Sequence, residues 1–387
     1  MVSNETYRRL LLPPKGSFFL LGVRGVGKST WTRAAFPKAH VIDLLDEQLY
    51  HSLLIDPSAF AAEVAALPRD TVVIVDEVQR VPGLLNEVHR AIESQRRRFI
   101  LLGSSARRLK TAGTNLLAGR AVLKTMLPLV PAELGRDFDL DRTLACGSLP
   151  VIWQAEDPQA ALSAYVQLYL REEIRGEALV RNLPAFVRFL PVAALFHGQT
   201  LNVSGLARDA ATSRTTIEGY LSILEDTLVA YRLPAFAGRL RVRERKHPKL
   251  FWVDPGLVRA AKRQLGQVSA EERGALFEGW VLTVLRAHNE VQPVFEDIAY
   301  WAPAESRLTE VDFLLRRGRE YLALEVKTCT RVGAKDFTGL RAVADLKGVV
   351  RRVLLYLGSR RLRTADGIDV WPLSTWLQAV ANDELWP

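Results

Sequence analysis

The segment 17–29, SFFLLGVRGVGKS, constrains the fold of this chain more than any other stretch. Its apolar and small residues at 17–21 predict a strand, a glycine-rich turn follows, and residues 29–35 predict a helix. The spacing GxxxxGKS matches a phosphate-binding loop. In such a loop, glycines let backbone N–H groups approach the phosphates, the lysine reaches the β- and γ-phosphates, and the serine hydroxyl binds Mg²⁺. We therefore expect the phosphate-binding residues to be Gly22, Arg24, Gly25, Gly27, Lys28, Ser29 and Thr30.

Strands and helices alternate through the rest of the N-terminal part. We expect strands at 40–46, 71–79, 99–105 and 121–129, and helices at 56–67 and 84–97. The strand at 71–79 contains a continuous apolar run, which is typical of a strand buried on both faces of a parallel sheet. This alternation predicts an α/β fold in which helices cover both sides of a parallel sheet.

The strand expected at 71–79 contains two acids, Asp76 and Glu77, near its end. Downstream of a phosphate-binding loop, an acid in this position completes the Mg²⁺ shell, and a neighbouring glutamate polarises the attacking water. Alone, such a pair would most often be a solvated turn. Together with the loop, it predicts that Asp76 and Ser29 bind Mg²⁺ and that Glu77 is the general base.

The strand at 99–105, FILLGSS, is expected to lie between the loop strand and the strand that carries Asp76. That position would place Ser104 or Ser105 near the γ-phosphate, where a polar side chain could sense hydrolysis; the alternative is a serine that caps the next helix. Arg107 and Arg120 are candidates for stabilising charge on the transferred phosphoryl group, one of them as an arginine finger across a subunit boundary.

Several blocks of residues 17–130 resemble the AAA-type ATPase domains of two-part ATP-binding proteins of bacteria and archaea: GVRGVGKST, VIVDEVQ, LLGSSARRL, LAGR and LPLVPAEL. The same family carries a C-terminal region of unknown function, which YLREEI, KHPKLFWVDPGL and GALFEGWV resemble. The resemblance covers nearly the whole chain. It implies that ATP and Mg²⁺ are the ligands, that ATP is hydrolysed, and that the chain assembles into a homo-oligomer such as a ring.

The middle of the chain has a helix–turn–helix pattern. Helices are expected at 161–170 and 184–196, then a short helix capped by Ser204 and, after a turn, a helix at 214–226. Arg214 and Thr215 open this last helix and could reach DNA. The basic residues that follow predict a wing that contacts a phosphate backbone, although a run of this kind is often a solvated loop: Arg239, Arg241, Arg243, Arg245 and Lys246.

The C-terminal part carries acids and a lysine on strands expected to be neighbours. Its helices are expected at 271–287 and 334–345, and its strands at 298–301, 310–315, 321–327 and 349–357. Asp312 and the sequence Glu325-Val326-Lys327 resemble the PD-(D/E)xK nuclease core. We expect Asp312 and Glu325 to bind Mg²⁺, Lys327 to orient water or offset charge, and Glu278 to complete the site. The alternatives are ordinary surface positions, or a nuclease-like fold without activity.

Composition limits the class of protein. The chain is 48% hydrophobic and 25% charged, as globular proteins are, and its formal charge of +9 favours polyanionic partners. Cys146 and Cys329 lie far apart, which predicts neither a disulfide framework nor a zinc site and suits the reducing cytosol. No stretch approaches about 18 apolar residues. We therefore expect no contact with a membrane and a cytoplasmic location.

Together these patterns predict three parts: an AAA-type ATPase domain at 1–135, a helical and winged-helix DNA-binding region at 136–265, and an α/β restriction-endonuclease-like domain at 266–387. The first hypothesis is an ATPase that couples hydrolysis to remodelling or Mg²⁺-dependent cutting of DNA, including branched or junction DNA. The second is a nucleotide-dependent switch whose nuclease-like domain is inactive and binds DNA or a protein partner. A third, a protein-remodelling chaperone, is disfavoured by the basic stretch.

Overall fold

The computed structural model describes residues 7–105, 117, 119–169, 182–237, 247–303 and 309–387. The chain forms two compact units. The first consists of Met1–Leu129, Leu149–Leu183 and Gly219–Val229, and the second of Val130–Ser148, Pro184–Glu218 and Ala230–Pro387. No helix in the described ranges is both long and apolar enough to cross a membrane.

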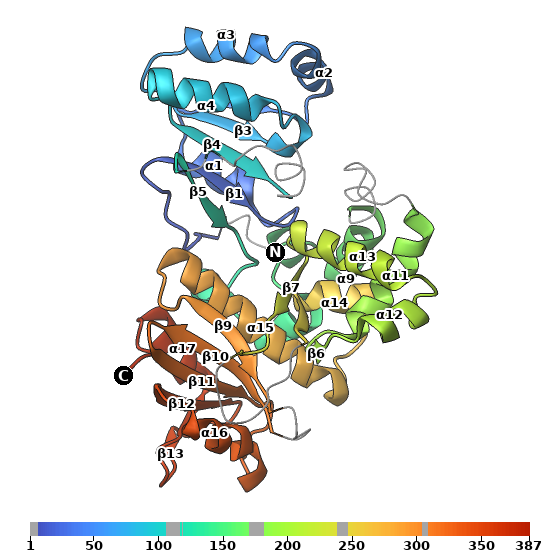
Figure 1. Ribbon diagram of the computed structural model, residues 1–387, viewed down its shortest axis with the longest axis vertical. Coiled ribbons are helices and arrows are strands. Elements are labelled where there is room, and N and C mark those ends of the chain that lie inside the picture. The colour runs from blue at the N-terminus through green and yellow to red at the C-terminus, as the bar shows by residue number, and fades with distance from the viewer. Residues whose placement is uncertain (1–6, 106–116, 118, 170–181, 238–246, 304–308) are drawn as a thin grey trace. The chain divides into compact units, whose positions relative to one another are not determined.

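The first unit is built on a five-stranded parallel sheet, ordered β2-β3-β4-β1-β5 (Figure 1). Its strands are β1 (Ser17–Leu21), β2 (His40–Asp43), β3 (Val73–Asp76), β4 (Phe99–Gly103) and β5 (Ala121–Thr125). Strand β4 pairs with both β1 and β3, so the expectation that it separates the loop strand from the Asp76 strand is confirmed. Strand β2 ends earlier than expected, because Asp46 accepts hydrogen bonds from the first N–H groups of the next helix.

Helices cover both faces of this sheet, as expected. They are α1 (Lys28–Ala35), α2 (Glu47–Ile55), α3 (Ser58–Ala66) and α4 (Leu84–Gln95), and the sequence analysis did not foresee α2. Successive strand residues point to opposite faces. Phe19 joins the core formed with Phe60 of α3 and Val88 of α4, whereas Phe18 meets Trp31 of α1 edge to face. Each fully buried side chain of this size contributes about 1.5–3 kcal/mol.

A helical segment after the sheet also belongs to the first unit. It contains α8 (Pro150–Trp153), α9 (Pro158–Ala164) and a π-helical turn (Tyr165–Tyr169). The second unit begins with α6 (Pro131–Leu134) and α7 (Leu140–Cys146), and later contains α14 (Pro255–Lys262). Asp254 caps α14 from a fully buried position: its carboxylate accepts hydrogen bonds from the backbone N–H groups of Leu257 and Ser148, at 3.2 and 2.7 Å.

The helix–turn–helix region contains α11 (Leu183–Leu195), α12 (Val203–Asp209) and α13 (Arg214–Asp226). A three-stranded antiparallel sheet, ordered β6-β8-β7, accompanies it: β6 (Gln199–Thr200), β7 (Ala230–Leu233) and β8 (Lys249–Trp252). The expected cap of α12 was wrong. Asn202 caps this helix by accepting a 2.9 Å hydrogen bond from the Gly205 N–H, and Ser204 lies inside the first turn.

The C-terminal sheet has six strands, ordered β13-β14-β12-β11-β10-β9 (Figure 1). They are β9 (Asp297–Trp301), β10 (Val311–Arg317), β11 (Glu320–Val326), β12 (Val349–Tyr356), β13 (Leu362–Arg363) and β14 (Asp369–Pro372). β9, β10 and β11 are antiparallel neighbours, whereas β12 runs parallel to β11 and to β14. The sequence analysis missed β13 and β14.

Three helices complete this part of the second unit: α15 (Ala270–Val291), α16 (Thr338–Ala342) and α17 (Leu373–Ala381). The expected helix at 334–345 is α16 flanked by two 3₁₀ turns. It carries the chain from β11 to the parallel strand β12, and Phe337, Leu340 and Val343 pack against Leu314 of the sheet. Helix α17 lies against β12 and β14.

Candidate functional site

The turn between β1 and α1 needs its glycines. Gly25 and Gly27 have φ angles of 75° and 95°, which residues with a side chain rarely adopt. A Cβ atom on Gly25 would lie 2.5 Å from Cγ1 of Val151, and the hydroxyl of Tyr165 donates a 2.8 Å hydrogen bond to the Arg24 carbonyl. The helical segment 150–165 is therefore packed directly against this phosphate-binding loop.

Lys28 and Ser29 take the positions that the motif predicts. The buried Lys28 ammonium donates to the carbonyls of Gly22 and Val23, at 2.8 and 3.4 Å, so it lies inside the curve of the loop. Ser29 Oγ donates a 2.6 Å hydrogen bond to Asp76 Oδ2. The structure thus brings together the loop and the carboxyl end of β3.

Asp76 is buried at that strand end. Burial raises the pKa of its carboxyl, the hydrogen bond from Ser29 opposes the rise, and the charges of Glu77 and Asp43 add to it. A cation beside Asp76 would offset this cost, because an opposite charge favours the ionised form. A carboxylate next to a hydroxyl, both oxygen ligands, suits Mg²⁺.

Glu77 and Ser104 also meet. Glu77 has a φ angle of 55°, a strained left-handed conformation of the kind that clusters at functional sites. Ser104 Oγ lies 3.3 Å from Glu77 Oε2, and Gln79 Nε2 donates to both side chains. Gln79 was not predicted from the sequence, although it lies two residues after Glu77 in the VDEVQ block. Ser105 is buried beside Ser104.

A cavity of about 570 Å³ adjoins the loop within the first unit. Its lining includes Gly27 and Thr30 of the loop region, Trp31 of α1, and Tyr7 and Arg9 from the segment before β1. Arg9 is fixed there, because its guanidinium donates to the carbonyls of Val26 (2.9 Å) and Leu127. The sequence analysis missed this cavity, since no local pattern relates residues 7–13 to α1.

Of the two candidate arginines, only Arg120 lies among the described residues. Arg120 lies just before β5, partly exposed, and forms an ion pair with Glu93 of α4. That contact, first through its hydrogen bond, lowers the pKa of Glu93. Arg107 lies outside the described residues. The assignment of a finger arginine therefore stays a prediction.

The predicted acids of the C-terminal sheet lie on neighbouring strands. Asp312 of β10 and Glu325 of β11 are both buried, and Asp312 Oδ2 accepts a 2.8 Å hydrogen bond from the Val326 N–H. Lys327 Nζ lies 2.5 Å from Glu325 Oε1. Burial lowers the pKa of Lys327, but the charges of Asp312 and Glu325 outweigh it and raise the pKa above its ordinary value.

Lys249 of β8 supplies a cation that the sequence analysis did not place here. Its side chain is only 4% exposed, and its ammonium lies 2.9 Å from Glu278 Oε1, 3.8 Å from Asp312 Oδ1, and in contact with Glu310. Burial lowers the pKa of Lys249, but these three carboxylates raise it above its ordinary value. We call Lys249, Glu278, Glu310, Asp312, Glu325 and Lys327 the C-terminal charge cluster.

The charge cluster holds more acids than bases. Burial raises the pKa of Glu278 to about 8 and the pKa of Glu325 well above its usual range, and the charge of Asp312 adds to both shifts. Glu325 Oε2 is buried and accepts no hydrogen bond from any described residue. Over the described ranges, no three His, Cys, Asp or Glu side chains are arranged to hold a metal ion. Because Lys249 already lies between the carboxylates, this donor set does not fit Mg²⁺ as it stands, and metal at Asp312 and Glu325 stays a prediction.

The predicted DNA contacts are described only in part. Arg214 and Thr215 are exposed at the start of α13, where Ser213 Oγ accepts the Thr216 N–H at 3.1 Å. The basic residues Arg239, Arg241, Arg243, Arg245 and Lys246 lie outside the described residues. DNA contact therefore stays a prediction.

The sheet order and the meeting of Lys28, Ser29 and Asp76 define a P-loop ATPase fold in the first unit. Sequence comparison agrees, since residues 15–135 match a family described as "AAA domain". The rest of the chain matches two families described as domains of unknown function, DUF8612 over residues 137–268 and DUF4143 over residues 273–376. The N-terminal part is thus similar to AAA-type ATPase domains.

Relatives of similar length carry names that assign no activity. An uncharacterized protein of Mycobacterium tuberculosis is 26% identical over 376 residues, which is 95% of this chain and 82% of the relative. An uncharacterized protein of Haemophilus influenzae is 23% identical over 410 residues, covering 97% and 98% of the two chains. Among solved structures, the chain is similar to a Walker-type ATPase of Pyrococcus abyssi, with 18% identity, 63% and 90% coverage of the two chains and a TM-score of 0.41.

Proposed function

We propose that the chain binds ATP with Mg²⁺ and hydrolyses it. The observation that carries this proposal is the 2.6 Å contact between Ser29 and Asp76 beside the buried Lys28. Ser29 and Asp76 would hold Mg²⁺, and the ion would neutralise charge on the phosphates. Lys28 would exchange the carbonyls of Gly22 and Val23 for the β- and γ-phosphate oxygens, which are stronger acceptors.

Glu77 would act as the general base. Gln79 and Ser104 both contact its Oε2 atom, which orients the carboxylate. Proton transfer to a positioned carboxylate contributes typically 10²–10⁴-fold to a rate. The contact between Ser104 and Glu77 supports the proposed role of Ser104 in sensing hydrolysis.

The cavity beside the loop would receive the nucleoside. It opens at Gly27, where the phosphates would begin, and its walls include the Trp31 and Tyr7 rings. Aromatic walls with a few polar groups are typical of nucleotide and cofactor sites. A change in tryptophan fluorescence that Trp31→Phe removes is therefore a direct probe of binding.

An ATPase assay combined with a nucleotide-binding assay tests this proposal. We expect Lys28→Ala to lose binding and hydrolysis, and Glu77→Gln to keep binding while its turnover falls about 10²–10⁴-fold. Asp70→Asn, which changes an exposed acid of the same unit, is the matched control and should hydrolyse ATP at the normal rate. Normal turnover by Glu77→Gln would remove Glu77 as the base.

We further propose that the second unit acts on DNA and that ATP controls this action. The placement of Asp312 and Glu325 on neighbouring strands, with Lys327 directly after β11, supports a nuclease-like module. Lys249, however, places its ammonium among three of the acids, where a metal ion would otherwise lie. This observation favours the hypothesis that the module binds DNA or a protein partner over the hypothesis that it cuts DNA.

Cleavage and binding can be separated by one experiment. Single-stranded, duplex and junction DNA are incubated with Mg²⁺ and ATP, and both the products and the ATPase rate are measured. Binding or ATPase stimulation without cleavage supports the switch. Mg²⁺-dependent cleavage that Glu325→Gln abolishes would instead establish the nuclease. If no form of DNA binds at low salt or stimulates the ATPase, both the DNA-dependent switch and the nuclease are refuted.

Arg214 and self-association require separate tests. Arg214→Gln should weaken DNA binding and reduce its dependence on salt, because one phosphate contact is lost. Light scattering with and without ATP would test the proposed homo-oligomer. A monomer under both conditions contradicts a finger arginine supplied by a neighbouring subunit.

A further inference from the structure

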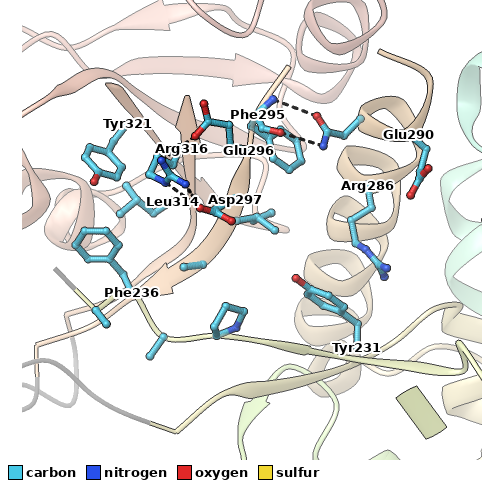
Figure 2. Close-up of a pocket in the computed structure, with 16 residues that line it drawn as sticks. Tyr231, Phe236, Arg286, Glu290, Phe295, Glu296, Asp297, Leu314, Arg316 and Tyr321 are labelled. Atoms are coloured by element: carbon cyan, nitrogen blue, oxygen red, sulfur yellow. Dashed lines mark hydrogen bonds and ion pairs between the residues drawn. The ribbon is translucent and has the colours of Figure 1, made fainter. Parts of the chain in front are cut away.

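The second unit contains another cavity, of about 530 Å³, which none of the candidate site residues discussed above lines (Figure 2). It lies among β7, the chain that follows β7, β9, β10 and α15. Its floor is apolar and buried, formed by Phe295, Ile298 and Leu314. The volume lies within the range of small-molecule sites, about 300–1,000 Å³.

Aromatic rings line two sides of this cavity. On one side Phe236 meets Tyr321 edge to face, with ring centroids 5.4 Å apart. Tyr231 and Arg286 lie on the other side (Figure 2). Rings on two sides suit a flat ligand, since base–aromatic stacking contributes about 1–3 kcal/mol per base.

Arg286 brings a cation to the cavity with donors to spare. Its guanidinium carbon lies 4.2 Å from the centroid of the Tyr231 ring, so stacking fixes it while its N–H groups remain in its own plane. It donates no hydrogen bond to another described residue. Burial lowers the pKa of Arg286, and the nearby charges of Tyr231 and Glu290 oppose that shift. A half-buried guanidinium of this kind favours a phosphate, which accepts paired N–H groups.

Acids stand at the opposite rim. Arg316 donates to Asp297 Oδ2 at 2.9 Å and lies 2.7 Å from Glu296 Oε2. Glu296 Oε1 accepts a 3.2 Å hydrogen bond from the Gly318 N–H, whereas Asp297 is paired on one oxygen. Both acids are exposed, and a carboxylate can only accept hydrogen bonds. They suit the amino and imino N–H groups of a base better than a second phosphate.

The wall between α15 and β9 is already formed. Asn289 Oδ1 accepts hydrogen bonds from the N–H groups of Val294 and Phe295, at 2.8 and 3.1 Å, and its Nδ2 donates to the Phe295 carbonyl. This side chain thereby ties the end of α15 to the chain that enters β9. Because this wall is already fixed, a ligand that binds the cavity loses little free energy to the ordering of side chains and loops.

We propose that this cavity binds a single nucleotide, with the base between the Phe236 and Tyr231 sides and the phosphate on Arg286. The nucleotide is either free in solution or the terminal nucleotide of a strand, since both present the same base and phosphate. The site is separate from the phosphate-binding loop, because every residue that lines it belongs to the second unit.

The test uses the full chain carrying Lys28→Ala, so that binding at the phosphate-binding loop does not contribute. The probes are the four nucleoside 5′-monophosphates and 5′-phosphorylated tetranucleotides, measured by calorimetric titration. We expect Arg286→Gln and, independently, Phe236→Leu to weaken binding at least tenfold. Arg331→Gln, an exposed arginine of the same unit, is the matched control.

The pattern of binding identifies the source of the nucleotide. Binding of monophosphates supports a free nucleotide, and binding of tetranucleotides alone supports a strand end. The proposal is overturned if no probe binds, or if the folded Arg286→Gln and Phe236→Leu variants both bind normally. Thermal melting of each variant establishes that it is folded. The readout is binding, so the loss of ATPase activity through Lys28→Ala does not affect the result.

Discussion

Replacing Lys249 with methionine is the sharpest test of the C-terminal charge cluster. Methionine keeps an unbranched stem of similar length but removes the ammonium that lies among Glu278, Glu310 and Asp312. These carboxylates would then face one another without the cation. Lys327 is held by Glu325 and cannot replace it without breaking that 2.5 Å contact.

The size of the effect follows from the burial of the pair. Lys249 is 4% exposed and Glu278 15%, and breaking a buried ion pair by removing one partner costs about 3–5 kcal/mol. In a unit of about 200 residues, 1 kcal/mol shifts the melting temperature by roughly 2–4 °C. Lys249→Met should therefore melt about 6–20 °C below the wild type.

The assay is calorimetric or circular-dichroism melting at pH 7. Lys347→Met, which changes an exposed lysine, serves as the control and should melt within about 2 °C of the wild type. Adding Glu310→Gln to Lys249→Met should recover part of the loss, because one of the carboxylates that the ammonium contacted is then neutral. A Lys249→Met protein that melts with the wild type would refute the buried cluster. Recovery by millimolar Mg²⁺ in this variant alone would show that Lys249 stands where a metal can bind.

Three further predictions concern single positions. Gly25→Ala should abolish nucleotide binding, because the φ of 75° at Gly25 and the 2.5 Å approach to Val151 leave no room for a Cβ atom. The assay is tryptophan fluorescence, and normal binding would contradict the loop geometry. Asp254→Ala should lower the free energy of unfolding by about 2–4 kcal/mol in denaturant titration, because it removes a helix cap and leaves the buried Ser148 N–H unpaired. A loss under about 0.5 kcal/mol would contradict the structural role of Asp254. Burial lowers the pKa of His197 to about 3, so the unfolded chain takes up a proton near pH 6.5 that the folded chain refuses. Stability from this residue is therefore complete above pH 6.5 and falls by about 1.4 kcal/mol per pH unit toward pH 3, a slope that His197→Asn should lack.

Much of the first unit could be predicted because its signals are local. Strand, glycine turn and helix follow one another in residues 17–35, and the apolar run before Asp76 indicates a strand buried on both faces. The position of β4 between β1 and β3 also followed from these motifs. The structure then brings Ser29, Asp76 and Glu77 together as parallel strand ends require.

The remaining features depend on contacts between distant residues. Nothing in the sequence KLFW indicates that Lys249 will meet acids on α15 and β10, because a buried lysine acquires its role only from its partners. The cavity around Arg286 is equally hidden, since its walls come from β7, α15 and β9. Local pattern also misplaced the cap of α12, where Asn202 and not Ser204 accepts the Gly205 N–H.

The contact of Val151 and Tyr165 with the phosphate-binding loop makes the helical segment 150–165 a sensor of the loop's state. Val151 fills the space that Gly25 leaves, and the Tyr165 hydroxyl holds the Arg24 carbonyl. A nucleotide whose binding shifts the loop would move this segment. By linkage, a partner bound to the segment would change the affinity for the nucleotide by the same factor by which the nucleotide changes the affinity for the partner. Control of ATP hydrolysis from outside the phosphate-binding loop would therefore require no additional domain, only a ligand that displaces these two short helices.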